Sequence, residues 1–433
     1  MLIDRGSKIV IVGAGCFGLS TAYHLLKRGF KHITILDRSP ILPAPEAAST
    51  DLSKVVRSAY ADPFYSDLAR EAIAAWKNKD EWADSYRESG VVVVFKSSGE
   101  SYNDYAFKND VAGGAPVQRL ENAAQLRAAF PGAPTVSFDG CAGYLNRDGG
   151  WALAAQGVQL LMARVEQLGA RVLAGRHVVE LMCSGARTTG VRCADGFEFP
   201  ADLVVLCAGS WTSASFPGLD LGQKCVATGQ SIALIQLSPE EVEQYRSCPV
   251  YMNNMDEFYC FPPNDEGIFK IATHRAGYTN MKPTSATPVS TPEFVRSADD
   301  KGSRIPKEAV ADLRASLAKI YPALAAKSFV STRLCWYTDS PDDNWVIGYH
   351  PADAGVMLAT AGSGHAYKFL PVIGRIVADA IEGKLESELM KKFAFDRDDG
   401  YEGTMRRASR GGDRKTLDLN DLCAPEDLLP MHV

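Results

Sequence analysis

A glycine-rich turn near the start of the chain is the first feature whose residue types and spacing indicate chemistry. Gly13, Gly15 and Gly18 follow an apolar run at 9–12 and open a helix-patterned segment, and Asp37 ends the next apolar run. Such glycines allow a tight turn, close approach of the backbone to a pyrophosphate, and close helix–strand packing. The helix N-terminus favours phosphates, and the acid accepts hydrogen bonds from ribose hydroxyls. The pattern predicts a dinucleotide site that disfavours a 2′-phosphate and leaves FAD and NAD both open.

A lysine inside an apolar segment is the second feature. Lys270 stands in Gly-Ile-Phe-Lys-Ile, where a buried ammonium group is costly unless it is paired or hydrated. The alternative is a strand-edge lysine whose amine reaches solvent. His274 follows at even spacing, so the two side chains share one face if the strand continues. A lone histidine is more often structural than catalytic, and both interpretations stay open.

The segments that must position these residues show two different patterns of apolar residues. Short apolar runs separated by helical segments predict a parallel sheet, and longer alternating strands predict a separate antiparallel sheet. The expected strands are 9–12, 33–36, 91–95, 170–172, 177–182, 201–209, 231–237, 257–273 and 355–360, and the expected helices are 67–76, 151–168, 306–320 and 362–382. The fold class predicted is a Rossmann-like α/β domain combined with an α+β substrate domain.

Composition excludes several classes of protein. The 433 residues carry a net charge of −6, so nothing suggests a nucleic-acid partner. No apolar run approaches the roughly 18–20 residues that a membrane span needs. The ten cysteines are scattered without a CxxC pair, which argues against a disulfide framework and a metal site and indicates a reducing compartment. With the first strand beginning by Lys8 and no Ser-Lys-Leu ending, we expect a cytoplasmic protein.

The chain resembles the monomeric sarcosine oxidase family of flavoproteins, near the fungal fructosyl amino acid, pipecolate and saccharopine oxidases. The resemblance covers about residues 8–395, and its segments occur in the family's order and spacing. They are IVGAGCFGLSTAYHL, DLSKVVRSAYADPFY, RDGGWALAA, ADLVVLCAGSW, GIFKIATHRAGYTN, LCWYTDSPDDNWVIGYHP and AGSGHAYKFLPVIG. The resemblance implies FAD, molecular oxygen as electron acceptor, and a secondary or N-substituted amino acid as substrate.

The resemblance also implies a two-domain layout. A discontinuous FAD-binding domain would take residues 1–88, 149–218 and 334–398. Residues 89–148 and 219–333 would form the substrate domain, whose antiparallel sheet covers the flavin. Residues 399–433 would form a C-terminal tail.

Six residues match family positions that contact the substrate or oxygen. Lys270 matches a lysine bridged by water to flavin N5, where positive charge favours electron transfer to oxygen. Arg57 and Lys368 match the pair that grips a substrate carboxylate, a task suited to a guanidinium fork and a second cation. His274, Tyr259 and Tyr337 match residues around the same cavity.

A larger set matches positions that hold the cofactor. Cys335 matches the cysteine bonded covalently to the flavin 8α carbon, and Lys54 falls where the family has a basic residue over the ring. We expect 362–365 to open a helix whose N–H groups face the flavin. The cofactor set is Gly13, Gly15, Cys16, Phe17, Gly18, Asp37, Arg38, Lys54, Val178, Ala208, Gly209, Trp211, Cys335, Gly362, Gly364, His365 and Lys368.

Differences between this chain and the subfamilies narrow the choice of substrate class. Fructosyl amino acid oxidases carry an acid where this chain has His274 and lack an arginine at the position of Arg57. These differences favour an α-carboxylate secondary amine over a glycated substrate, while a glycated substrate and a natural-product tailoring reaction remain alternatives. An electron-transferring dehydrogenase and an NAD-binding or non-catalytic module are the rival classes. We expect no macromolecular partner and a monomer.

Overall fold

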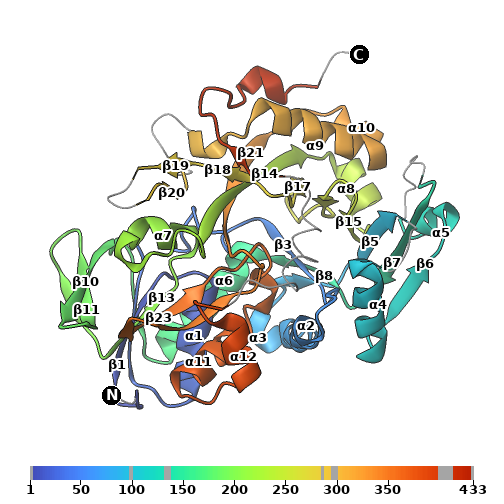
Figure 1. The fold of residues 1–433 in the computed structure, drawn as a ribbon. Coiled ribbons are helices and arrows are strands. Elements are labelled where there is room, and N and C mark those ends of the chain that lie inside the picture. The colour runs from blue at the N-terminus through green and yellow to red at the C-terminus, as the bar shows by residue number, and fades with distance from the viewer. Residues whose placement is uncertain are drawn as a thin grey trace.

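The computed structural model describes residues 3–96, 101–130, 138–283, 287–293, 301–397 and 413–430. A six-stranded sheet forms the lower half of the molecule in Figure 1, in the order β22-β23-β13-β1-β2-β9. Its neighbours pair in parallel except for β22 and β23, which are antiparallel. The strands are β1 (Lys8–Val12), β2 (His32–Leu36), β9 (Arg171–Leu173), β13 (Leu203–Leu206), β22 (Val346–His350) and β23 (Asp353–Thr360).

Alternate residues of this sheet enter two different cores. Ile9 and Ile11 pack with the helices on one face, whereas Val10 and Val12 pack with a smaller sheet on the other. The helices that contact one another on the first face are α1 (Cys16–Lys27), α6 (Ala154–Gln167) and α11 (Ile373–Ile381). Burial on both faces explains the nearly continuous apolar runs of these strands.

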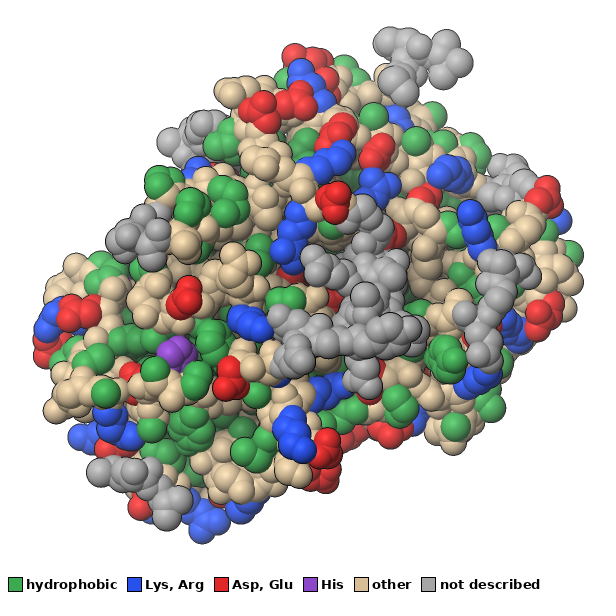
Figure 2. Space-filling view, in the orientation of Figure 1, with side chains coloured by type: hydrophobic (Ala, Val, Ile, Leu, Met, Phe, Trp, Pro, Cys, Tyr) green, Lys and Arg blue, Asp and Glu red, His purple; other side chains and the backbone are tan. Residues whose placement is uncertain are grey.

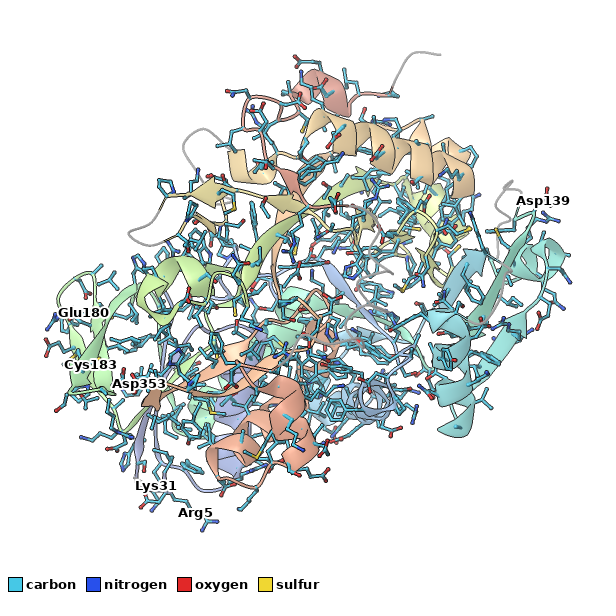
Figure 3. All side chains as sticks on the ribbon, viewed as in Figure 1. Arg5, Lys31, Asp139, Glu180, Cys183 and Asp353 are labelled. Atoms are coloured by element: carbon cyan, nitrogen blue, oxygen red, sulfur yellow. The ribbon has the colours of Figure 1, made fainter. Side chains whose placement is uncertain are left out.

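A three-stranded sheet covers the second face. Its strands are β10 (Val178–Ser184), β11 (Arg187–Cys193) and β12 (Glu198–Pro200). It is attached to the six-stranded sheet by Thr188, whose backbone N–H and hydroxyl donate to the Asp353 carboxylate at the start of β23. Asp353 is labelled in Figure 3, close to Cys183 of β10.

A ten-stranded sheet forms the other half of the molecule. Its strands are β5 (Val91–Lys96), β6 (Val117–Leu120), β7 (Cys141–Asn146), β14 (Val226–Gln236), β15 (Val250–Asn253), β16 (Phe258–Cys260), β17 (Ile268–Thr273), β18 (Tyr278–Thr279), β21 (Ser331–Asp339) and β24 (Lys415–Thr416). Helices α9 (Lys307–Ile320) and α10 (Pro322–Ala325) lie across one side of it (Figure 1). On the opposite side Cys335, Tyr337 and Tyr259 share a buried cluster, and this side packs against the segment around Gly364, where a Cβ would meet the Tyr337 ring.

Among the described residues, the remaining strands form two small sheets, β3-β8-β4 and β19-β20, and seven further α-helices pack around the sheets. The strands are β3 (Ser53–Val56), β4 (Tyr86–Arg87), β8 (Gly150–Leu153), β19 (Met281–Lys282) and β20 (Val289–Ser290). The helices are α2 (Pro63–Trp76), α3 (Lys79–Trp82), α4 (Tyr102–Ala112), α5 (Ala123–Ala128), α7 (Thr212–Ser215), α8 (Pro239–Tyr245) and α12 (Ser387–Phe393).

Four details of the secondary-structure prediction are wrong. Residues 151–153 belong to strand β8, and the helix expected from 151 begins at Ala154. The strand expected at 257–273 is two strands, β16 and β17. Strand β17 ends at Thr273, so His274 lies just beyond it. The segment 362–365 is a turn, followed by a 3-10 turn at Tyr367–Phe369, and helix α11 begins only at Ile373.

The predicted fold class, with its parallel and antiparallel sheets, is confirmed. The division into domains stays a prediction, and one strand crosses its boundaries: β21 begins three residues before position 334 and pairs with β14 of the ten-stranded sheet. The described end of the tail adds β24 beside β18. Just before the tail, Arg397 forms a buried two-pronged ion pair with Asp342.

The surface carries both signs of charge. On the face in Figure 2, Lys and Arg side chains alternate with Asp and Glu without one sign dominating. Within the described part of the chain, no helix is long and apolar enough to cross a membrane, and no group of His, Cys, Asp or Glu side chains has the arrangement of a metal site.

Candidate functional site

A cavity of about 430 Å³ opens at the carboxyl ends of β1, β2 and β13. This is the edge at which ligands bind in open parallel sheets. The predicted residues that line it are Gly13, Gly15, Cys16, Phe17, Asp37, Arg38, Lys54, Val178, Ala208, Gly209, Trp211, Tyr337, Gly362, Gly364 and His365. The predicted residues outside this lining are Gly18, Arg57, Tyr259, Lys270, His274, Cys335 and Lys368.

The glycines shape one end of the cavity. Gly13 has φ +111°, and a Cβ there would stand 2.4 Å from the Cys207 carbonyl oxygen. A Cβ on Gly18 would stand 1.9 Å from the Gly13 carbonyl oxygen, so only glycine lets α1 pack this closely on the turn. Gly15 precedes the first residue of α1 and faces the cavity, which directs the positive end of the helix dipole into it.

Asp37 holds the turn from the end of β2. Its carboxylate accepts hydrogen bonds from the backbone N–H of Ala14 at 2.8 Å and of Ser39 at 2.9 Å. Burial raises the pKa of this carboxyl, and the two N–H donors oppose the rise. Asp37 therefore organises the turn as well as facing the cavity, which sequence reasoning did not anticipate.

The far wall is made by residues from three other segments. The Arg38 guanidinium stacks on the Trp211 ring at 3.8 Å from its centroid. Val178 at the start of β10 and the segment Ala208–Gly209 complete this wall. The wall thus combines a stacked cation–aromatic pair with small residues that let a ligand approach the backbone.

The turn at 362–365 lines the cavity beside Phe17 at the start of α1, but not as a helix N-terminus. Ser363 N–H donates to the Thr338 carbonyl oxygen, and His365 N–H donates to that of Gly362. These two N–H groups are therefore used inside the protein, contrary to the expectation that they face a ligand. Gly364 has φ +68°, and a Cβ there would meet Tyr337 at 2.4 Å and His274 at 2.7 Å. The turn thus packs directly against the ten-stranded sheet.

A cluster of charged side chains lies at the junction of the two halves. Lys270 is 1% exposed, and its Nζ donates to Asp51 Oδ2 at 2.6 Å and to the Ser53 carbonyl oxygen at 2.7 Å. Lys54 Nζ lies 2.9 Å from the same Asp51 oxygen and 3.4 Å from Cys335 Sγ. Lys54 lines the cavity, with Cys335 and Lys270 buried behind it.

The pKa values in this cluster move in different directions. Burial lowers the pKa of Lys270 to about 8, an effect that Asp51 opposes and Lys54 reinforces. The two lysines hold the pKa of Asp51 well below its usual range, overcoming the effect of burial. Asp51 likewise raises the pKa of Lys54 despite its burial.

The two predicted carboxylate-binding cations both lie next to Tyr60. Lys368 Nζ donates to the Tyr60 hydroxyl at 2.7 Å and to the His365 carbonyl oxygen at 2.8 Å. The Arg57 guanidinium lies 5.1 Å from the centre of the Tyr60 ring and donates to the Ala59 carbonyl oxygen. Lys368 is 5% exposed, so the charge is held in a largely apolar setting.

The aromatic residues complete this region. Tyr259 on β16 and Tyr337 on β21 are both buried, and burial raises the pKa of the Tyr259 hydroxyl well above its usual value. The His274 ring lies 5.7 Å from that of Tyr337. The predicted residues therefore fall into two groups. One group, around Lys54, contains Lys270, Cys335, Tyr259, Tyr337 and His274. The other is Arg57 and Lys368 around Tyr60.

Sequence reasoning missed two members of the junction, Asp51 and Tyr60. Both carried a signal: Asp51 stands three residues before Lys54, and Tyr60 three residues after Arg57, in DLSKVVRSAY. An acid beside a suspected buried lysine is the expected counter-ion, since a buried charge needs a partner.

The sequence was compared with known families and proteins. The model of the DAO family, described as FAD dependent oxidoreductase, matches residues 8–380. The chain belongs to this FAD-dependent oxidoreductase family. It is 30% identical to L-saccharopine oxidase of Schizosaccharomyces pombe over 409 residues, covering 90% of this chain and 93% of the relative. It is 24% identical to monomeric sarcosine oxidase of a Bacillus species, covering 90% and 96%.

Solved structures agree with the sequence comparison. The fructosyl peptide oxidase from E. terrenum superposes with a TM-score of 0.85 at 27% identity, covering 96% of this chain and 97% of that one. The predicted family and enzyme class are confirmed, and so is FAD as the cofactor of the family. The cavity fits this cofactor because its lining joins a glycine cradle and a helix N-terminus to an end that contains Lys54 and Tyr337.

Proposed function

We propose that the protein is an FAD-dependent oxidase that converts the C–N bond of a secondary amino acid to an imine and reduces oxygen to hydrogen peroxide. The observation that carries the proposal is the cationic end of the cavity. Lys54 lies in its wall, and Lys270 lies directly behind that wall on the same Asp51 carboxylate. A cofactor site that ends at desolvated positive charge suits a reaction that delivers electrons to oxygen.

The chain supplies binding and charge, and bound FAD supplies the two-electron acceptor that oxygen regenerates. Arg57 and Lys368 bind the substrate carboxylate, which places the amine and its neighbouring C–H bond in the cavity. The substrate loses a hydride equivalent and a proton to become an imine, and water hydrolyses the imine. Those two electrons and two protons convert one oxygen molecule to hydrogen peroxide. Lys270 stabilises the negative charge that develops on oxygen.

We also propose that Cys335 holds the flavin covalently. Its Sγ lies beside Lys54, and alternation along β21 directs Cys335 and Tyr337 to the same side. The bond replaces the Cys335 S–H and one C–H of the flavin 8α methyl group by S–C, and oxygen accepts the two electrons and two protons released. Colour that stays with acid-precipitated protein would support the linkage. Free flavin in the supernatant would contradict it, and Cys335→Ser should release the colour.

The substrate class is tested by peroxide release. Purified protein is incubated with sarcosine, pipecolate, saccharopine, N-methyl aromatic amino acids and fructosyl amino acids, with anaerobic reactions as controls. We expect α-carboxylate secondary amines to be the better substrates, because Arg57 and Lys368 provide two cations for that group.

Glycated amino acids are the second candidate, favoured by the structural similarity to fructosyl peptide oxidase. Faster turnover of the fructosyl compounds would replace the first proposal by the second. A colourless protein would refute both. A yellow protein that is reduced by substrate but not reoxidised by air would indicate a dehydrogenase.

A monomer in the cytoplasm stays a prediction. Light scattering of the purified protein and fractionation of cells that produce it would test the two statements separately.

A further inference from the structure

Asp51 lies between two lysines, one of which, Lys54, lines the cavity. Both ammonium groups approach the same oxygen, Oδ2, at 2.6 Å from Lys270 and 2.9 Å from Lys54. Its side chain is 4% exposed. One carboxylate oxygen therefore joins Lys270 of the ten-stranded sheet to Lys54 of the cavity wall.

The position of Asp51 is fixed from its other side. Oδ1 accepts a hydrogen bond from Leu52 N–H at 2.8 Å, and the Asp51 carbonyl oxygen accepts one from Ala155 N–H at 3.1 Å. Ala155 stands in the first turn of α6, a well-packed helix. These hydrogen bonds fix the Asp51 carboxylate beside α6, and the carboxylate in turn fixes the positions of the two ammonium groups.

Positive charge exceeds negative charge at this point. Besides Lys54 and Lys270, the Arg333 guanidinium stabilises the charged form of Asp51, and its Nη1 donates to the Thr50 carbonyl oxygen at 3.0 Å. The other titratable groups that interact with the cluster are Cys335, Tyr259 and Tyr367. Asp51 is thus the carboxylate that both lysines share.

We propose that Asp51 is a positioning residue: its shared carboxylate holds Lys54 and Lys270 together at the flavin end of the cavity and keeps both ammonium groups charged there. The proposal deepens the proposed oxidase function and rests on it, since the two lysines act on the flavin and on oxygen. Asp51 itself acts only through them.

Removing the charge of Asp51 and removing the charge of Lys54 should shift the pKa of Lys270 in opposite directions. Loss of the Asp51 charge leaves two buried ammonium groups without their common carboxylate, so the pKa of Lys270 should fall. Loss of the Lys54 charge removes a repelling neighbour, so the pKa of Lys270 should rise. A charge at contact distance changes a pKa by about 1–3 units, which sets the expected size of both shifts.

The experiment follows lysine titration by NMR in protein labelled at lysine Cε, without and with FAD, and needs no turnover. Lys270→Met assigns the signal. Asp51→Asn should lower the titration midpoint of Lys270 by about one unit or more, and Lys54→Met should raise it. Asp51→Glu keeps the carboxylate and should leave the midpoint at its wild-type value. Asp342→Asn is the matched control, because it removes a carboxylate from a buried ion pair elsewhere.

Several outcomes would overturn the proposal. It fails if Asp51→Asn and Lys54→Met shift the midpoint in the same direction, or if Asp342→Asn shifts it as far as Asp51→Asn does. If Asp51→Asn does not fold, the two other variants still test the proposal. An unchanged titration midpoint of Lys270 in Lys54→Met, or a changed one in Asp51→Glu, would overturn it. A merely structural role would lower the melting temperature of the Asp51 variants without moving Lys270. These readouts are separate from the failure of the proposed oxidase, which a colourless protein would show.

Discussion

Lys270 should make the reaction of the reduced enzyme with oxygen depend on pH. Its pKa of about 8 lies below the usual lysine value because burial disfavours the ammonium form. The charged form assists oxygen, so the rate constant should be high below this pKa and fall as pH rises through it. A single group with this pKa is about 99% protonated at pH 6 and about 9% at pH 9, so the rate constant should fall about tenfold between them.

The assay mixes anaerobically reduced enzyme with oxygenated buffer in a stopped-flow instrument and follows the return of oxidised flavin absorbance. Lys270→Met should lower the rate constant by about 100-fold or more and abolish the inflection near pH 8. Lys319→Met is the matched control, since Lys319 is an exposed lysine paired with Asp256. A wild-type rate constant unchanged from pH 6 to 9, or an inflection that persists in Lys270→Met, would refute the reasoning.

Two further predictions concern the framework around the cavity. In the Cys335→Ser background, where FAD is held without a covalent bond, Gly18→Ala should weaken FAD binding at least tenfold, because its Cβ would displace the Gly13 carbonyl. Gly218→Ala places its Cβ in open space and should leave the affinity unchanged. Equal affinities of the two variants in a flavin titration would contradict the packing argument. Arg397→Met should lower the free energy of unfolding by about 3–5 kcal/mol, because it leaves the buried Asp342 carboxylate without its ion-pair partner. Urea denaturation measures this loss, and an unchanged midpoint would count against it.

Patterns of apolar residues predicted the fold well where a strand is buried on both faces. Strands β1, β2 and β13 appear as continuous apolar runs, and each was placed within a few residues. Prediction failed at 151–153, where the apolar spacing continues smoothly from β8 into α6 and a strand–helix junction leaves no break in it. At 362–365 the glycines were taken for a helix start, but positive φ at Ser363 and Gly364 forms a turn instead.

The candidate site was predictable one residue at a time, but its connections were not. Gly13, Gly15 and Asp37 follow from a local motif, because a single turn places all three. The apolar neighbours of Lys270 predict a buried ammonium group, yet nothing in those neighbours indicates that its partner is Asp51, 219 residues earlier. Pairing of distant charges depends on how the two sheets pack, which local spacing does not encode.

Packing of the ten-stranded sheet against the small sheet β3-β8-β4 is also what gives the charges their chemical character. Lys54 and Asp51 come from the segment around β3, and Lys270 comes from β17 of the ten-stranded sheet, so neither group excludes water from this cluster alone. Only when the sheets meet do the ammonium groups lose their hydration, and only then does a carboxylate at 2.6 Å offset the cost of burying Lys270. An ammonium group held charged in a dry site acts on a nearby electron transfer far more strongly than one in water. The reactive end of the cavity is therefore a property of the assembled molecule, and substitutions that loosen the packing on the ten-stranded sheet, such as one at Gly364 beside Tyr337, should weaken it without touching a charged residue.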